Sequence, residues 1–249
     1  MLINPSKLKS IWKVNPKSIL HIGAHMAEEL DQYQNLQGGS VVWVEAQREL
    51  AEKLSQQFNG TGHRVIHAAA WDIDNLELNL NVTNNSQSTS LLELGTHRGD
   101  YPNIKVSKIE IVKTSRIDSI FNKESIPEFI NIDIQGAEIQ ALKGFGELLH
   151  QVKYLYCEVN NREVYVGCAK VSEIDEYLGL FGFERITTRW VPRKGWGDAF
   201  YINASLSAVS KFMRISGTIY RIAYPLNYLA AASWSRLKRF LKLSSKFHP

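Results

Sequence analysis

The 249-residue sequence has little of what marks a membrane, secreted or metal-binding protein. It contains only two cysteines, Cys157 and Cys168, and neither has metal-binding spacing around it, so reduced thiols in a cytosolic protein are expected. The N-terminus has no basic segment followed by an apolar one, which is the pattern of a secretory signal. No apolar run reaches the ~20 residues that a membrane-spanning helix needs. We therefore expect a cytoplasmic protein.

Acidic residues are absent from the end of the chain. The net charge is +4, and Asp198 is the last acidic residue. Residues 205–249 carry eight Lys and Arg and no Asp or Glu, so residues 1–204 carry the difference, which is −4. This asymmetry predicts two units, a mildly acidic body at 1–204 and a basic tail at 205–249, that have different partners.

What the body does contain is an alternation of short apolar runs and helical segments. Apolar runs at residues 18–22, 40–45 and 64–70 predict strands, and residues 27–36 and 47–58 between them predict helices. Strands separated by helices of ~10–15 residues indicate right-handed βαβ units and a parallel sheet. With 44% hydrophobic residues, the chain has enough apolar material for one large core. The fold class is therefore α/β.

The alternation changes in the middle of the body. Residues 76–82 and 106–112 alternate strictly between apolar and polar, which predicts strands with one solvent-exposed face. A long polar loop, which includes the Ser-rich residues 86–90, separates them, and such loops are often functional. Later segments predict two more buried strands, a helix and a closing antiparallel pair, at residues 128–133, 152–159, 171–180, 184–191 and 199–203.

The central buried strand ends at a carboxylate. Apolar residues alternate up to Asp133, and a helix that contains Glu138 follows. Ligands of open α/β sheets bind at the carboxyl ends of the strands, and Glu158 stands at the corresponding end of the next buried strand. The alternative is that Asp133 only caps the helix that follows it. The pattern favours a group of three acids, Asp133, Glu138 and Glu158, at one edge of the sheet.

The first strand leads into His21-Ile-Gly-Ala-His25, which lies before the first predicted helix of the alternation. This turn is not the G-x-G-x-x-G of NAD and FAD proteins, and the chain has no P-loop motif, so both phosphate-binding fingerprints are missing. Glu45 ends the second strand, 22 residues after Gly23, where an acid can accept both ribose hydroxyls of an adenosine. Plain turn chemistry at Gly23 and a solvated end of a strand at Glu45 are the alternatives.

Together these motifs resemble the FkbM family of S-adenosylmethionine-dependent O-methyltransferases. The resemblance covers roughly residues 18–203 and is most specific in Asp133-Ile-Gln-Gly-Ala-Glu138 and its Leu142-Lys-Gly144 extension. It implies a class I methyltransferase, Rossmann-like sheet of seven strands whose last strand is antiparallel, flanked by helices. It also implies S-adenosylmethionine as the cofactor, bound by Gly23, Ala24, Glu45, Ala69 in the 68–72 turn, and Asp133.

The resemblance has two departures in its first motif. The family's motif usually begins with an acid and closes with Gly, whereas this chain has His21 and Ala27 at those places. We expect His21 to be a buried histidine whose hydrogen bonds are satisfied, and we assign it no cofactor role.

The resemblance implies methylation of a hydroxyl, most simply that of a sugar in a surface glycan or polysaccharide. Such a hydroxyl stays protonated at neutral pH, so a base should assist the reaction. Asp133, with Glu158 and Glu138, supplies the candidates for this base, and His25 and His97 are weaker ones. No metal site is assigned, although three acids are able to hold a divalent cation. The alternative function is a non-catalytic sugar-binding or scaffold protein on the same fold.

Nucleic acid is not an expected partner, because the [DN]-P-P-[FY] element of base N-methyltransferases is absent. The tail instead predicts an amphipathic basic helix that starts near Pro225. Its apolar and aromatic residues recur at helical spacing beside its cations, which favours peripheral attachment to an anionic membrane at the cytoplasmic face. A helix packed on the body, or on a second subunit in a homo-oligomer, is the alternative.

Overall fold

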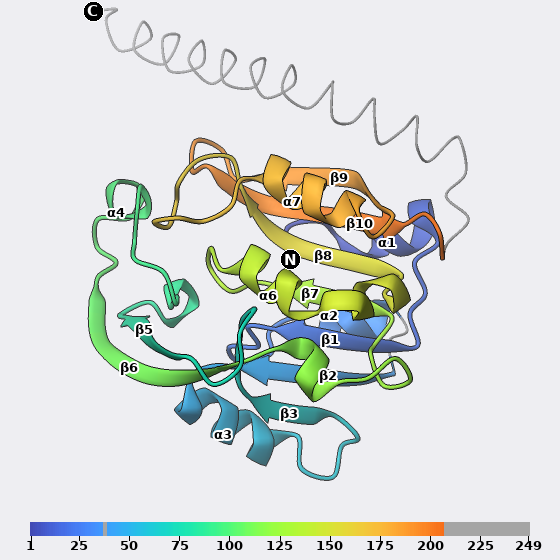
Figure 1. The fold of residues 1–249 in the computed structure, drawn as a ribbon, viewed down its shortest axis with the longest axis horizontal. Coiled ribbons are helices and arrows are strands. Elements are labelled where there is room, and N and C mark those ends of the chain that lie inside the picture. Colours follow the sequence, from blue (N-terminus) through green and yellow to red (C-terminus); the bar gives the residue numbers. More distant parts are fainter. Residues whose placement is uncertain (37–38, 207–249) are drawn as a thin grey trace, which may run out of the picture.

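Seven strands form the central sheet of the computed structural model, which describes residues 1–36 and 39–206. The strand order is β3-β2-β1-β7-β8-β10-β9, and Figure 1 shows the sheet running from β3 to β9. The strands are β1 (Ser18–Ile22), β2 (Ser40–Glu45), β3 (Arg64–His67), β7 (Phe129–Ile132), β8 (Tyr154–Asn160), β9 (Phe183–Trp190) and β10 (Trp196–Asn203).

The strand directions confirm the expected sheet. Strands β3, β2, β1, β7 and β8 pair in parallel, and β10 is antiparallel to both of its neighbours, β8 and β9. Parallel strands place their carboxyl ends at one edge, so Gly23, Glu45, Asp133 and Glu158 come from neighbouring strand ends. This edge is where open α/β sheets bind their ligands.

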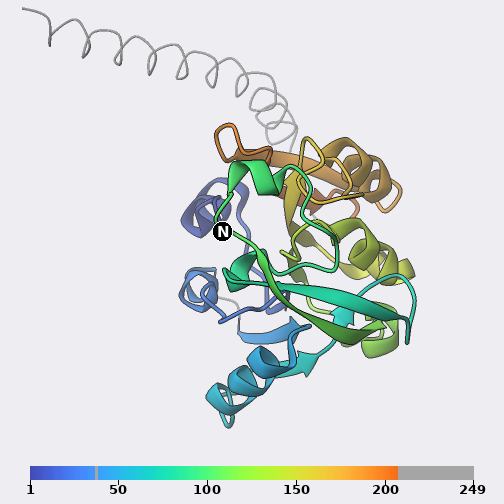
Figure 2. The same ribbon diagram turned by 90° about the vertical axis from the view of Figure 1, so that its left-hand side faces the viewer.

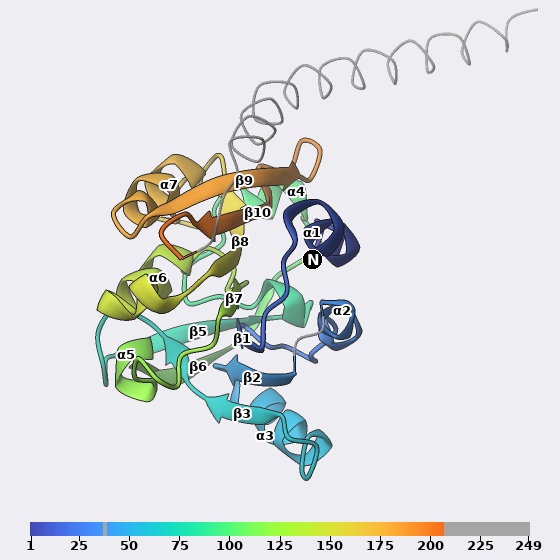
Figure 3. The ribbon, with the colours of Figure 1, turned by 90° about the vertical axis from the view of Figure 1, so that its right-hand side faces the viewer.

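Helices cover both faces of the sheet, as Figure 3 shows. One face is covered by α1 (Pro5–Trp12), α2 (Leu30–Asn35) and α3 (Arg48–Gln57), and the other by α5 (Ile117–Ile120), α6 (Glu138–Gly144) and α7 (Val171–Gly179). Each layer has its own buried apolar cluster. Strands with helices on both faces must be mostly apolar on both faces, which explains the composition of β1 and β7, where His21 and Asn131 are the buried polar exceptions.

A second sheet, of order β4-β6-β5, lies beside the carboxyl edge of the first. It contains β4 (Ala69–Ala70), β5 (Glu77–Thr83) and β6 (Val106–Ser115), and between β5 and β6 lie the 3₁₀ helix η1 (Ser86–Ser88) and α4 (His97–Asp100). Figure 2 shows β5, β6 and α4 on this side of the molecule. Ile109 and Ile111 are 59% and 72% exposed, so these apolar side chains of β6 face solvent, whereas the alternation predicted that its polar side chains would do so.

Several predicted boundaries are wrong. The strand expected at residues 64–70 breaks at Ala68, whose N–H donates to the carbonyl of Glu45, so its end joins the second sheet as β4. The first predicted helix starts at Leu30 rather than at residue 27, because Ala27 has φ +57°, outside the helical region. Residues 196–198 belong to β10 instead of preceding it, and α1 has no counterpart in the sequence prediction.

Three further expectations concern the cysteines, membrane-spanning helices and the basic tail. Cys157 and Cys168 are free thiols, and both are buried. Within residues 1–36 and 39–206, no helix is long and apolar enough to cross a membrane. The predicted basic helix lies in residues 205–249, which are outside the described part of the chain except for Ser205 and Leu206.

Close packing explains why the Leu-Lys-Gly segment that ends α6 has a glycine at position 144. A matched pair of variants can test this explanation. A Cβ at Gly144 would overlap the carbonyl oxygen of Trp71, whereas a Cβ at Gly179, the last residue of α7, would meet nothing within 4 Å. Gly179→Ala should leave stability unchanged or raise it by up to ~1 kcal/mol. Gly144→Ala should lower the free energy of unfolding by about 1–3 kcal/mol, because overpacking displaces backbone. Chemical denaturation measures both, and equal effects would contradict the steric explanation.

Candidate active site

A cavity of about 390 Å³ opens at the carboxyl ends of β1, β2, β7 and β8. Five of the predicted site residues line it together: Gly23, Glu45, Ala69, Asp133 and Glu158. The Ser-rich loop also lines it, through residues 85–91. Its volume falls in the ~300–1,000 Å³ range of small-molecule sites. Residues far apart in the sequence therefore meet at the position that the sheet topology favours for a ligand.

The turn after β1 joins three strand ends. The N–H groups of Gly23 and Ala24 donate to the carbonyl of Val44 at 2.9 and 3.1 Å, and the N–H of Asp133 donates to the carbonyl of Ile22. Gly23 has φ +89°, and a Cβ there would overlap the carbonyl oxygen of Asp133. Only glycine combines this backbone angle with so close an approach. Ala24 is fully buried behind the turn and does not line the cavity.

Glu45 lies at the end of β2 with its carboxylate held by the backbone. One oxygen accepts the N–H of His25 at 2.8 Å, and the other accepts the N–H of Gln47 at 2.7 Å. Glu45 is only 8% exposed, and burial raises the pKa of its carboxyl above the usual value. Each carboxylate oxygen has a further lone pair, so the group is fixed in place and still able to accept hydrogen bonds from a ligand.

Gln47, which no sequence motif indicates, lies next to Glu45 on the cavity wall. Its Oε1 is buried and has no hydrogen-bond partner. An unsatisfied buried acceptor costs about 1–3 kcal/mol unless a ligand or water supplies a donor. The wall beside it is apolar and comes from Leu50, Ala68–Ala70 and Leu80. This end of the cavity therefore offers flat apolar surface together with fixed acceptors.

The acids of β7 and β8 are joined by an amide. Gln135 Nε2 donates to Asp133 Oδ1 at 2.7 Å and to Glu158 Oε2 at 2.9 Å. The Gln135 Oε1 accepts the hydroxyl of Tyr165 at 2.5 Å, and its backbone oxygen accepts the hydroxyl of Ser90 at 2.6 Å. Gln135 has φ +56°, which is uncommon outside glycine. No sequence pattern shows that a polar loop residue turns back between two strand ends, so this bridge was not predicted.

Burial changes the proton affinity of this group. Burial, and then the charge of Asp198, raises the pKa of Asp133 to about 6. Burial and the neighbouring charges of Asp133 and Glu138 raise the pKa of Glu158 well above its usual range. When two close carboxyls differ in this way, one retains its proton while the other ionises. Of the two, Asp133 is the acid that ionises first as the pH rises.

Glu138, the third predicted acid, does not line the cavity. It is 1% exposed, and its Oε1 accepts the N–H groups of Ile134 and Gly136 at 3.2 and 2.9 Å. Burial raises its pKa to about 7. These bonds shape the loop that carries Gln135, so the geometry gives Glu138 a role in positioning this loop and no contact with the cavity.

His21 is buried, as expected for a histidine with satisfied hydrogen bonds. Its Nδ1 lies 3.0 Å from the hydroxyl of Tyr33, and its ring lies 5.2 Å from that of Trp43. Burial lowers the pKa of His21 to about 4, so the imidazole is neutral at physiological pH. It belongs to the aromatic layer between β1 and α2.

His25 connects the turn after β1 to the Ser-rich loop across the cavity. Its Nε2 is 2.7 Å from the hydroxyl of Ser86, and its Nδ1 is 2.6 Å from Glu28 Oε1. The backbone N–H of the same residue donates to Glu45. The bonds of His25 therefore couple the position of the loop to that of Glu45.

Four aromatic side chains line the other end of the cavity: His97, Tyr101, Tyr165 and Trp196. We call this group the aromatic wall. The His97 ring lies 4.9 Å from Tyr101 and 5.4 Å from Tyr165, and the Trp196 Nε1–H donates to the Tyr101 hydroxyl at 3.2 Å.

Of the residues that the structure describes, no three His, Cys, Asp or Glu side chains are placed to hold a metal ion.

Comparison with solved structures shows the same fold in proteins of different sequence. Sp1610 from Streptococcus pneumoniae, a proposed tRNA (m1A22) methyltransferase, superimposes with a TM-score of 0.51 at 12% identity, over 100% of this chain and 90% of that one. A protein of the NADB-Rossmann superfamily from Streptococcus agalactiae gives 0.51 at 13% identity, over 100% and 88%. Identities this low show the fold alone. A search of curated protein sequences finds no match.

The sheet order and its antiparallel strand β10 place the protein in the Rossmann-like class I methyltransferase fold. The family model described as the methyltransferase FkbM domain matches residues 21–185, well over half of the chain. The chain therefore belongs to the FkbM methyltransferase family, and S-adenosylmethionine is its cofactor. This confirms the family and the cofactor predicted from the motifs.

Glu45 provides a test of the cofactor end of the cavity. Glu45→Gln removes the charge and replaces one acceptor oxygen with a donor, so we expect cofactor affinity to fall by roughly 1–3 kcal/mol. The melting temperature should change little by comparison. Calorimetry with S-adenosylmethionine measures the affinity. Glu49→Gln, on the exposed surface of α3, is the matched control and should bind as the wild type does. Unchanged binding by Glu45→Gln would show that this carboxylate does not contact the cofactor.

Proposed function

We propose that this methyltransferase transfers the methyl group to a hydroxyl oxygen, and that the acceptor is a sugar of a surface glycan or polysaccharide. The observation that carries the proposal is the bridged pair Asp133 and Glu158, whose unequal pKa values provide one ionised carboxylate at the cavity wall. The aromatic wall beside this pair suits the apolar face of a sugar ring.

The residues at the other end of the cavity fit S-adenosylmethionine. We assign the ribose hydroxyls to Glu45, because its fixed carboxylate lines the cavity. The small apolar side chains of Ala68–Ala70 suit the adenine ring, and the unpaired Gln47 Oε1 suits a donor on the ligand. Gly23, and Asp133 beside it, face the remainder of the cofactor, while Ala24 supports the turn from behind. When bound, the cofactor supplies an activated methyl group on a sulfonium.

The protein must then place the acceptor oxygen and accept its proton. Placing the two reactants in line contributes much of the rate enhancement of such a transfer. Asp133 is the proposed base, because its carboxylate ionises at about pH 6 and is held by Gln135 at the cavity wall. Glu158 is proposed to remain protonated beside it and to limit the negative charge of the pair. A positioned base typically contributes a factor of ~10²–10⁴.

Asp133→Asn tests this assignment. It preserves the shape of the side chain but removes the base, so turnover of a sugar acceptor should fall by about 10²-fold or more while cofactor affinity changes much less. In the wild type, turnover should rise as the pH increases through about 6, because the ionised form of Asp133 is the active one. Pre-steady-state methyl transfer across a pH series measures both effects.

Glu158→Gln is the control on the neighbouring strand and should retain more activity than Asp133→Asn. Wild-type turnover in both variants would mean that placement alone suffices for catalysis. Loss of activity in EDTA with recovery in magnesium would instead make the acids metal ligands. Cofactor and sugar binding without any methyl transfer would favour a non-catalytic sugar-binding or scaffold protein.

We further propose that residues 205–249 form a unit distinct from the catalytic body of residues 1–204, and that they attach the protein peripherally to the cytoplasmic face of an anionic membrane. The support comes from the sequence, in which eight cations occur without a single acid. Each cation near an anionic surface contributes about 1 kcal/mol. Such attachment suits an enzyme that acts on lipid-linked glycans. Packing against a second copy of the chain is the competing role of this segment.

Vesicle co-sedimentation tests the tail. The full chain should pellet with anionic vesicles more than with neutral ones, and a chain ending at Ala204 should not. A full-length variant with Arg236, Lys238, Arg239 and Lys242 changed to Gln should also lose the preference for anionic vesicles. The control changes four exposed lysines of the body to Gln, namely Lys7, Lys105, Lys123 and Lys143. If all four proteins pellet equally, the tail does not bind membranes.

A further inference from the structure

His97 carries a polar atom that neither the fold nor the proposed base uses. The residue lines the cavity and is only 4% exposed, yet its Nδ1 is buried without a hydrogen-bond partner. Burial lowers the pKa of His97, so the ring is neutral at physiological pH. Buried ring nitrogens are normally paired, and because His97 lines the cavity, a bound ligand is a candidate for the missing partner.

The position of His97 is fixed by backbone bonds. The N–H groups of Gly95 and His97 donate to the carbonyl of Val164 at 3.0 and 3.1 Å, and that of Thr96 donates to the carbonyl of Glu163 at 3.0 Å. The Arg162 guanidinium also binds the carboxylate of Asp100, the last residue of α4. Four contacts therefore hold α4 against the loop that follows β8. The imidazole is pre-positioned, as a binding group should be.

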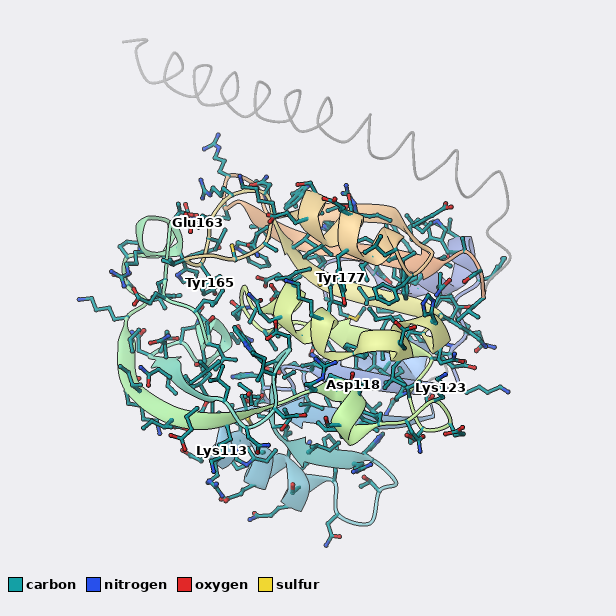
Figure 4. The ribbon with its side chains drawn as sticks, in the orientation of Figure 1. Lys113, Asp118, Lys123, Glu163, Tyr165 and Tyr177 are labelled. Atoms are coloured by element: carbon teal, nitrogen blue, oxygen red, sulfur yellow. The ribbon has the colours of Figure 1, made fainter. Side chains whose placement is uncertain are left out.

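The same loop links His97 to the bridged acids. Tyr165 packs against the His97 ring and donates its hydroxyl to Gln135, which contacts Asp133 and Glu158. Figure 4 labels Tyr165 and Glu163 in this loop, beside α4. The path of contacts from His97 to Asp133 runs through two intervening side chains. The imidazole and the carboxylate therefore stand at different points of the cavity wall.

A hydroxyl is the ligand group that fits Nδ1. Neutral imidazole has one nitrogen that donates and one that accepts. A hydroxyl can donate to an unprotonated Nδ1 or accept from a protonated one, so it satisfies either tautomer. A methyl, ether or carboxylate group lacks this ability for at least one tautomer. The rings of Tyr101 and Tyr165 pack against that of His97, and a hydrogen bond is stronger in such low-dielectric surroundings.

We propose that His97 Nδ1 hydrogen-bonds a second hydroxyl of the acceptor, separate from the one presented to Asp133. This inference rests on the proposed O-methyltransferase function and extends it. The acceptor must then carry at least two hydroxyls on a rigid frame, as a pyranose does, and a simple alcohol cannot use the site fully. The aromatic wall contacts the ring of this acceptor, and His97 determines which of its hydroxyls reaches the base.

The test uses the full-length protein saturated with S-adenosylhomocysteine, and a panel of methyl pyranosides as probes. His97→Phe retains a ring against Tyr101 and Tyr165 but no nitrogen. His97→Asn places a polar atom close to the position of Nδ1, whereas His97→Gln places one closer to that of Nε2. Dissociation constants are measured by saturation-transfer NMR, with cyclohexanol as a probe that has a single hydroxyl. His150→Asn, on the exposed surface of η2 (Gly146–Gln151), is the control.

We expect at least one pyranoside to bind the wild type and to bind His97→Phe and His97→Gln about tenfold more weakly, as the loss of one hydrogen bond predicts. His97→Asn should stay within about threefold of the wild type. Affinity for S-adenosylhomocysteine and for cyclohexanol should be the same in all proteins. Equal pyranoside binding by wild type and His97→Phe would overturn the role of His97 alone. If no pyranoside binds a wild type that binds S-adenosylhomocysteine, the sugar acceptor is overturned together with this inference.

Discussion

The Gln135 amide between Asp133 and Glu158 is the interaction on which the site depends. It joins the ends of two neighbouring parallel strands and holds their carboxyl groups at a defined separation. The Gln135 Oε1 accepts a hydrogen bond from the hydroxyl of Tyr165. The same side chain therefore positions the loop after β8 and the α4 segment that is hydrogen-bonded to this loop. One loop residue thus connects the acids of the sheet edge to the aromatic wall beside them.

The bridge in turn requires the turn geometry around it. Gln135 adopts a left-handed backbone conformation, and Gly136 follows with φ +105°. Glu138 makes this conformation possible by accepting the N–H groups of Ile134 and Gly136. A Cβ at Gly136 would come within 2.8 Å of Tyr165, so glycine there also admits the Tyr165 side chain. The Asp133-Ile-Gln-Gly-Ala-Glu138 motif therefore determines the shape of the loop and also supplies acidic side chains.

The sequence predicted the sheet well because its central strands are buried on both faces and appear as short, mostly apolar runs. It also placed Gly23, Glu45, Asp133 and Glu158 at one edge, since parallel topology forces their strand ends together. It could not separate β4 from β3, because the break at Ala68 depends on a hydrogen bond to Glu45. Gln47, Gln135 and Tyr165 were missed, since their importance comes from contacts between loops and leaves no periodic signal.

The buried carboxyls also couple the chemistry to the pH dependence of folding. An Asp or Glu in the unfolded chain ionises near pH 4, whereas the pKa values of Asp133 and Glu138 in the folded protein are about 6 and about 7. Between these values the folded state binds more protons than the unfolded state, so the contribution of these groups to stability falls as the pH rises from about 4 to about 7. Asp133 is therefore ionised only at pH values where its burial makes the native state less stable. The same buried carboxyl lowers stability and provides the proposed base for proton transfer.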